Sequence, residues 1–168
     1  MKNHAASIEQ RIAEFTDACR RAGLRITCQR QEIFRELAKA KDHPSAEALH
    51  KRLRGTFPNI SLDTVYRTLS TLASCGVISK IDTMESQGRY EANFVRHHHL
   101  ICHDCKEIMD FQWHDFDEAT LPQEVKNWGR IGSPNVVIYG ICQKCLDVQD
   151  GNPRTATAYG PDHAGRHI

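Results

Sequence analysis

Apolar positions in the first half of the chain recur at helical spacing, in segments that each begin with a Ser or Thr. A hydroxyl side chain at such a position can accept a hydrogen bond from a free backbone N–H and marks the start of a helix. The predicted helices begin after Ser7, Thr27, Ser45 and Ser61. The fourth runs from Leu62 to about Ser74, and Gly23 and Gly76 are typical helix stops.

After Gly76 the pattern becomes typical of short strands. Residues 77–81 are mostly apolar, 83–88 form a polar turn and 89–92 resume the strand pattern, which predicts a hairpin. Short helices followed by a two-stranded wing indicate a winged helix-turn-helix domain, with the third and fourth helices as the helix-turn-helix proper. A helical bundle with an appended hairpin is the alternative.

The second half alternates short strands with polar loops, over 99–102, 107–111 and 135–140, with a weaker helix near 118–128. We therefore expect an α+β fold with a winged-helix domain over 1–90 and a small α/β domain over 91–149. The small polar residues of 150–168 predict a disordered tail. The chain shows neither a membrane-spanning run nor a signal peptide, so we expect a cytoplasmic protein with no membrane partner.

Charge divides the chain in the same way. Residues 1–90 hold 15 Lys and Arg against 10 Asp and Glu, whereas residues 91–168 hold 7 against 11. A basic first half suits a polyanion such as nucleic acid, and an acidic second half rich in His and Cys suits cations.

Two Cys-x-x-Cys pairs are the strongest chemical signal, Cys102 with Cys105 and Cys142 with Cys145. Four thiolates complete the closed tetrahedral shell of a structural zinc site, which would stabilise a domain too small for a large core. Two disulfides or a redox Cys-x-x-Cys are the alternatives, although a reducing cytosol keeps thiols free. We expect the remaining cysteines, Cys19, Cys28 and Cys75, to be buried on apolar helix faces.

Three consecutive histidines precede the first cysteine pair. In an extended backbone, His97 and His99 project from one face of the strand. Two carboxylates on neighbouring strand-like segments, Glu91 and Asp110, and His43 at a proline break could complete a mixed shell of nitrogen and oxygen ligands. Such a shell suits Fe(II), Mn(II) or Zn(II). A surface histidine cluster without metal is the alternative.

The fourth predicted helix carries Thr64, Tyr66 and Arg67 on its polar face, which suits insertion into a major groove. Basic residues elsewhere in the first half could hold phosphates. The predicted DNA-binding residues are Arg25, Arg30, Ser61, Thr64, Tyr66 and Arg67. A solvated helix face is the alternative.

Four ordered segments, 23–30, 43–46, 57–69 and 97–105, resemble the Fur family of metal-dependent transcriptional repressors, and the resemblance covers about 10–148. It implies a homodimer that binds palindromic operator DNA when a regulatory metal is bound. It also implies a regulatory site of His43, Glu91, His97, His99 and Asp110 and a structural zinc held by the paired cysteines. The family's additional metal site is predicted to be absent, because its positions read Arg96, His98 and Pro134.

The aspartate at position 110 makes the sequence resemble the peroxide-sensing PerR branch, because ferric-uptake members usually have Glu at this position. The resemblance then implies that peroxide reacts with regulatory Fe(II), that oxygen is added to His43 or His97, and that repression is lost. Mn(II) would give an active but insensitive repressor. The main alternative is a Fur-type iron or zinc sensor released by metal loss.

Two hypotheses come from other classes, a metallohydrolase and a zinc-stapled protein-interaction module. A hydrolase needs a substrate pocket and a general base beyond the metal ligands, and the sequence nominates neither. We therefore expect no enzyme activity and no small organic substrate.

Overall fold

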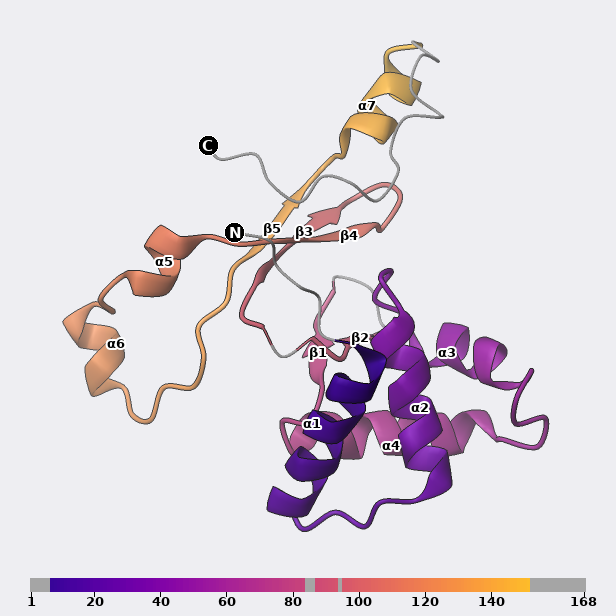
Figure 1. Cartoon of the computed structure of the whole chain (residues 1–168). Helices are drawn as coiled ribbons and strands as arrows, with labels where there is room; N and C mark the ends of the chain where they lie inside the picture. The colour runs from indigo at the N-terminus through magenta and orange to yellow at the C-terminus, as the bar shows by residue number, and fades with distance from the viewer. Residues whose placement is uncertain (1–6, 84–86, 94, 152–168) are drawn as a thin grey trace. The chain divides into compact units, whose positions relative to one another are not determined.

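The computed structural model describes residues 7–83, 87–93 and 95–151 (Figure 1). The chain divides into two compact units, Met1–Arg96 and His97–Ile168. Among the described residues, no helix has the length and apolar character needed to cross a membrane. The tail predicted over 150–168 lies outside the described part of the chain from residue 152 onwards.

Helices α1 to α4 make up most of the first unit. They are α1 (Ile8–Arg21), α2 (Cys28–Lys39), α3 (Ala46–Leu53) and α4 (Leu62–Ser74). Each begins directly after the predicted hydroxyl side chain, which accepts a hydrogen bond from the backbone N–H three residues further on. Gly23 and Gly76 follow α1 and α4 with φ of +67° and +68°, a backbone that glycine adopts without strain. The four predicted helices and their starts are confirmed.

The core of the first unit joins all of these helices. Phe15 of α1 and Phe34 of α2 stack with ring centroids 4.3 Å apart, and both are fully buried. Val65, Leu69 and Leu72 form the buried stripe of α4. The first unit therefore has a core of its own. Burial of each such side chain stabilises the fold by about 1.5–3 kcal/mol.

The expectation that three cysteines would be buried in this core is only partly correct. Cys19 is buried in α1, but Cys28 and Cys75 are exposed. Cys28 is the first residue of α2 and Cys75 is the C-cap of α4. Residues at helix ends can lie outside the packed stripe even when their spacing matches it, which explains why the prediction is wrong for these two.

Two short strands, β1 (Ser79–Ile81) and β2 (Arg89–Glu91), pair antiparallel and form the predicted wing. β2 is also tied to the segment before α3, because the Tyr90 N–H donates a hydrogen bond to the Pro44 carbonyl at 3.1 Å. Together with α3 and α4, the wing gives the first unit the winged helix-turn-helix architecture expected from the sequence.

The second unit is built on a three-stranded sheet of order β4-β3-β5. Its strands are β3 (His98–Cys102), β4 (Ile108–Phe111) and β5 (Val137–Gly140). β4 is antiparallel to β3, whereas β5 is parallel to it. Parallel strands need a long connection, and here it contains α5 (His114–Glu118) and α6 (Gln123–Asn127). The last helix, α7 (Gln143–Gln149), follows β5.

The helices of the second unit differ from the predicted single helix near 118–128. The prediction is correct for α6, which lies inside that span, but the predicted bounds are too wide, because α5 ends at Glu118 and α6 begins only at Gln123. Pro122 lies between them, and a proline disfavours helical backbone at the residue before it. The sequence did not predict α7, whose N-cap residue Cys142 makes no side-chain capping hydrogen bond.

Candidate metal centres and nucleic-acid interface

The four paired cysteines converge in the second unit. Cys102 ends β3 and Cys105 lies in the turn that follows, whereas Cys142 is the N-cap of α7 and Cys145 lies in its first turn. The Sγ atoms of Cys102 and Cys145 are 3.8 Å apart, and those of Cys105 and Cys142 are 3.6 Å apart. All four Sγ atoms lie within 4.8 Å of one another, and all four thiols are free.

These distances fit a zinc ion. A tetrahedral shell with Zn–S bonds of about 2.3 Å has sulfur-to-sulfur edges of about 3.8 Å. The two shortest sulfur contacts, 3.8 and 3.6 Å, agree with that edge. The predicted four-cysteine cluster is therefore confirmed as a cluster that could hold zinc.

The cysteine thiols do not ionise equally. Burial opposes ionisation of Cys102, but backbone N–H groups of Cys142, Cys105 and Asp104 outweigh it and lower the pKa of Cys102 to about 6. The Cys142 N–H donates to this sulfur at 3.3 Å. Burial and the neighbouring sulfurs raise the pKa of Cys145 to about 12. Sulfurs this close can all be thiolates only when a cation shares their charge.

Two polar contacts link α7 to the segment between β3 and β4, and neither was predicted from the sequence. Lys144 Nζ lies 3.0 Å from both carboxylate oxygens of Glu107. The Gln149 amide donates to Asp104 at 2.7 Å. Exposed pairs of this kind contribute little stability. The cysteine cluster is therefore the principal link between α7 and the segment that follows β3.

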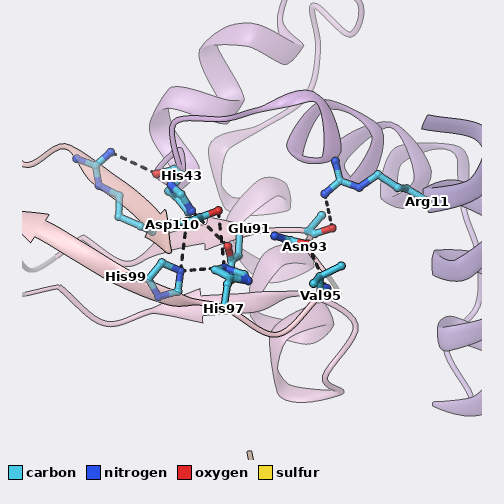
Figure 2. A network of polar contacts seen from close by, with 10 residues as sticks. Arg11, His43, Glu91, Asn93, Val95, His97, His99 and Asp110 are labelled. Carbon is cyan, nitrogen blue, oxygen red and sulfur yellow. Dashed lines mark hydrogen bonds and ion pairs between the residues drawn. The ribbon is translucent and has the colours of Figure 1, made fainter. Parts of the chain in front are cut away.

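In the first unit, His43 and Glu91 form a buried pair (Figure 2). The Nε2 atom of His43 lies 3.3 Å from Oε2 of Glu91. His43 has φ of +46°, a backbone region that non-glycine residues rarely adopt and that occurs preferentially at functional sites. Arg11 donates at 2.7 Å to the carbonyl of Ala92, the residue after Glu91. The pair offers one imidazole and one carboxylate to a metal ion.

In the second unit, His97, His99 and Asp110 form a second ligand cluster (Figure 2). The Nε2 atoms of the two histidines are 3.1 Å apart. The Asp110 carboxylate oxygens lie 3.8 Å from His97 Nε2 and 3.7 Å from His99 Nε2. Ligands bonded to one metal at about 2.1 Å are separated by about 3 Å, so the two imidazoles are spaced as metal ligands. The prediction that they project from one face is confirmed.

His98 lies apart from this cluster. It is fully buried, its ring accepts the Val136 N–H at Nδ1 at 3.1 Å, and its Nε2 faces Asp117 at 3.3 Å. The rings of Phe111 and Phe116 pack against the His98 ring, with ring centroids 5.4 and 5.3 Å from its centroid. His98 therefore ties β3 to α5 and to the segment before β5. Strand alternation predicted that His98 faces away from His97 and His99, but it did not predict which residues His98 contacts.

Several predicted DNA-binding residues are engaged within the first unit. Ser61 accepts the Thr64 N–H at 3.1 Å, and their hydroxyl oxygens are 2.8 Å apart. The Tyr66 hydroxyl donates to Glu47 of α3. Arg67 Nη1 lies 3.7 Å from the Asp63 carboxylate, and both side chains are largely exposed.

The remaining two predicted residues lie near the start of α2. Arg25 is exposed, and Arg30 donates to its backbone carbonyl at 2.6 Å. Tyr66 and Arg67 are exposed on α4, so the polar helix face predicted for a nucleic acid is present.

A winged helix-turn-helix unit, followed by a unit that carries cysteine and histidine–carboxylate clusters, defines a protein of the winged-helix class with two candidate metal-binding clusters. Comparison with known proteins identifies the family. The chain belongs to the ferric uptake regulator family, whose model matches residues 21–130.

The chain is similar to peroxide-responsive repressors named PerR from Staphylococcus aureus, with 35% identity over 142 residues, which are 84% of this chain and 95% of the relative. Its fold resembles the Helicobacter pylori ferric uptake regulator, described as having three functional metal-binding sites, with TM-score 0.68, 28% identity and coverage of 87% and 97% of the two chains. It also resembles a ferric uptake regulator from Pseudomonas aeruginosa with manganese, with TM-score 0.63, 26% identity and coverage of 77% and 98%.

The family resemblance inferred from the four sequence segments is thus confirmed. Members of this family are transcriptional regulators and not enzymes, so the chain is a metal-responsive repressor and the metallohydrolase hypothesis is set aside.

Proposed function

We propose that this protein is a peroxide-sensing repressor that binds operator DNA as a homodimer and depends on Fe(II) or Mn(II). The observation that carries the proposal is the cluster in which the His97 and His99 nitrogens lie 3.1 Å apart beside the Asp110 carboxylate. Imidazole and carboxylate ligands suit Fe(II) and Mn(II) better than the all-sulfur cluster does. The 35% identity to peroxide-responsive repressors supports the choice of signal.

We infer that His43 and Glu91 of the first unit share one metal ion with His97, His99 and Asp110 of the second. Each cluster alone supplies too few ligands for a complete shell of five or six. An ion held by both units restricts their relative orientation, and it favours whichever orientation supplies all of the ligands. His43 is the residue that couples metal binding to the DNA-binding unit, because it lies directly before Pro44 and the N-cap of α3.

DNA binding is assigned to the exposed face of α4, which carries Thr64, Tyr66 and Arg67. Arg25 and Arg30 supply positive charge at the start of α2, where phosphates could bind. A helix-turn-helix protein that recognises a palindrome does so as a dimer, with one helix in each half-site.

A homodimer is supported by the edge of the second unit's sheet. β5 is an edge strand in the order β4-β3-β5, and its side chains Ile138 and Tyr139 are 41% and 37% exposed. Edge strands with exposed apolar side chains can pair with another chain. A second copy of this protein would cover β5.

We assign a structural zinc ion to the four cysteines. Among the described residues of the second unit, the buried apolar side chains are those of Ile101, Cys102 and Ile108. So small a core gives little stability by itself, so the energy of binding zinc becomes folding energy.

Peroxide sensing would take place at the histidine ligands of the regulatory metal. When bound, Fe(II) would supply the redox chemistry that activates peroxide beside these imidazoles, which Mn(II) would not readily support; one peroxide oxygen would add to a ring and the other would leave as water. His43 and His97 are the imidazoles assigned as oxidation targets. An oxygen atom added to either ring would alter the nitrogen that binds the metal, so the ring would no longer hold the ion. The two units would then no longer be joined through one shared metal ion.

The test is peptide mass analysis of Fe(II)-loaded protein after brief exposure to peroxide, with Mn(II)-loaded protein as the control. We expect one added oxygen on the peptide containing His43 or His97 in the iron sample alone, together with loss of binding to operator duplex. If neither sample shows an oxidised histidine, the peroxide assignment is wrong and the protein responds to metal level.

A further inference from the structure

The hydroxyl group of Tyr66 has a partner that limits what it can do at a DNA surface. Tyr66 lies on α4 and donates its phenolic proton to a carboxylate oxygen of Glu47 on α3. A phenol has one proton to donate and lone pairs that accept. Because the proton is committed to Glu47, the Tyr66 oxygen can offer only acceptor capacity to a ligand.

The charges of the pair are fixed by the same bond. The hydrogen bond from Tyr66 lowers the pKa of the Glu47 carboxyl, and its acceptance by Glu47 raises the pKa of the phenol. At neutral pH the carboxylate is therefore charged and the phenol is protonated. A negative charge directly behind the hydroxyl disfavours a DNA phosphate at this position, because like charges repel.

Base edges respond differently to such a group. In the major groove, guanine presents two acceptors, N7 and O6, whereas adenine and cytosine present an amino donor and thymine presents a methyl group. An acceptor backed by a carboxylate opposes both guanine acceptors. It matches an amino group, and the carbon edge of the tyrosine ring can pack against the thymine methyl.

We propose that Glu47 turns Tyr66 into a filter against guanine, so that Tyr66 contacts a base edge and rejects guanine at the position it faces. The inference rests on the proposed function, in which the exposed face of α4 enters the major groove. Tyr66 is the residue that reads the base, and Glu47 is a positioning residue that acts through it.

The experiment selects binding sites for the Mn(II)-loaded full-length protein from a pool of random duplex DNA. The variants are Glu47→Ala, which frees the phenolic proton, and Tyr66→Phe, which keeps the ring and removes the hydroxyl. Glu36→Gln is the charge control, because it also removes one carboxylate charge but pairs with Lys39 on α2. Thermal unfolding shows whether each variant is folded. If Glu47→Ala does not fold, the comparison of Tyr66→Phe with the wild type is the test.

We expect the wild-type protein to deplete guanine by about tenfold at one position of each half-site, the cost of one mismatched contact. Glu47→Ala should admit guanine there, Tyr66→Phe should weaken the preference at the same position, and Glu36→Gln should change neither. The inference is overturned if Tyr66→Phe lowers affinity equally for all selected sequences, or if guanine frequencies in Glu47→Ala match those of the wild type. Failure of the wild-type protein to select any sequence would instead refute the proposed function.

Discussion

Removal of the cysteine cluster should unfold the second unit and leave the first unit folded. The perturbation is Cys142→Ser, which takes away one of the four sulfurs that lie within 4.8 Å of one another. Ile101 and Ile108 are the buried aliphatic side chains among the described residues of this unit. Their burial contributes about 3–6 kcal/mol in total. A structural zinc site contributes about 10–16 kcal/mol near neutral pH, so its loss exceeds what this core can offset.

The two tryptophans of the chain, Trp113 and Trp128, both belong to the second unit and provide a selective probe of it. Trp113 packs against Phe116 with ring centroids 5.6 Å apart, so its near-ultraviolet circular dichroism reports packing in that unit. The far-ultraviolet signal comes mainly from α1 to α4, the long helices of the first unit. We expect Cys142→Ser, or chelation of the wild-type protein, to abolish the tryptophan signal and to keep most of the helical signal.

The matched control is Cys28→Ser, which makes the same chemical change at an exposed cysteine in the first unit. It should leave both signals unchanged. The reasoning is refuted if Cys142→Ser retains a cooperative thermal transition in the tryptophan signal at the wild-type temperature, because the unit would then be stable without its metal.

Three further predictions concern the first unit. His43→Ala should abolish the increase in operator affinity that Mn(II) causes, measured by fluorescence anisotropy, while the unit stays folded; undiminished metal response would contradict the coupling role. Phe34→Ala should lower the free energy of unfolding by about 3–5 kcal/mol in urea denaturation, because it removes a fully buried stacked ring, and a loss below about 1 kcal/mol would show that this ring is not central to the core. The hydrogen bond from Arg52 lowers the pKa of Asp42, so the pair stabilises the fold above the ordinary carboxyl pKa of 3.8 and this stabilisation is lost as the pH falls through the lowered value. Asp42→Asn should therefore reduce the acid dependence of the urea midpoint, and an unchanged pH profile would argue against the pair.

Local signals in the sequence were sufficient for the first unit. A hydroxyl residue before each apolar stripe marks a helix start, because the capping hydrogen bond involves residues only three positions apart. The second unit was harder to predict. Its helices are short, α7 begins without a side-chain cap, and Pro122 divides the predicted helix, so length and spacing gave the wrong boundaries there.

The same contrast holds for the candidate sites. Cysteine spacing and strand alternation predicted the four-cysteine cluster and the common face of His97 and His99, because both follow from local geometry. The partner of Tyr66 was missed. Glu47 is 19 residues away on another helix, and a contact at that separation depends on how α3 packs against α4 and not on any sequence pattern.

The parallel pairing of β3 with β5 has a consequence for how the protein is assembled during synthesis. The first unit is built mainly of helices, whose backbone hydrogen bonds join residues close in sequence, a feature typical of fast folding. In the second unit the partner strands and the two cysteine pairs are separated by the whole α5–α6 connection, so its topology cannot close until Cys142 and Cys145 have left the ribosome. We therefore expect each new chain to complete its helix-turn-helix first and to acquire its metal-dependent half last, so that the supply of zinc governs when the chain matures.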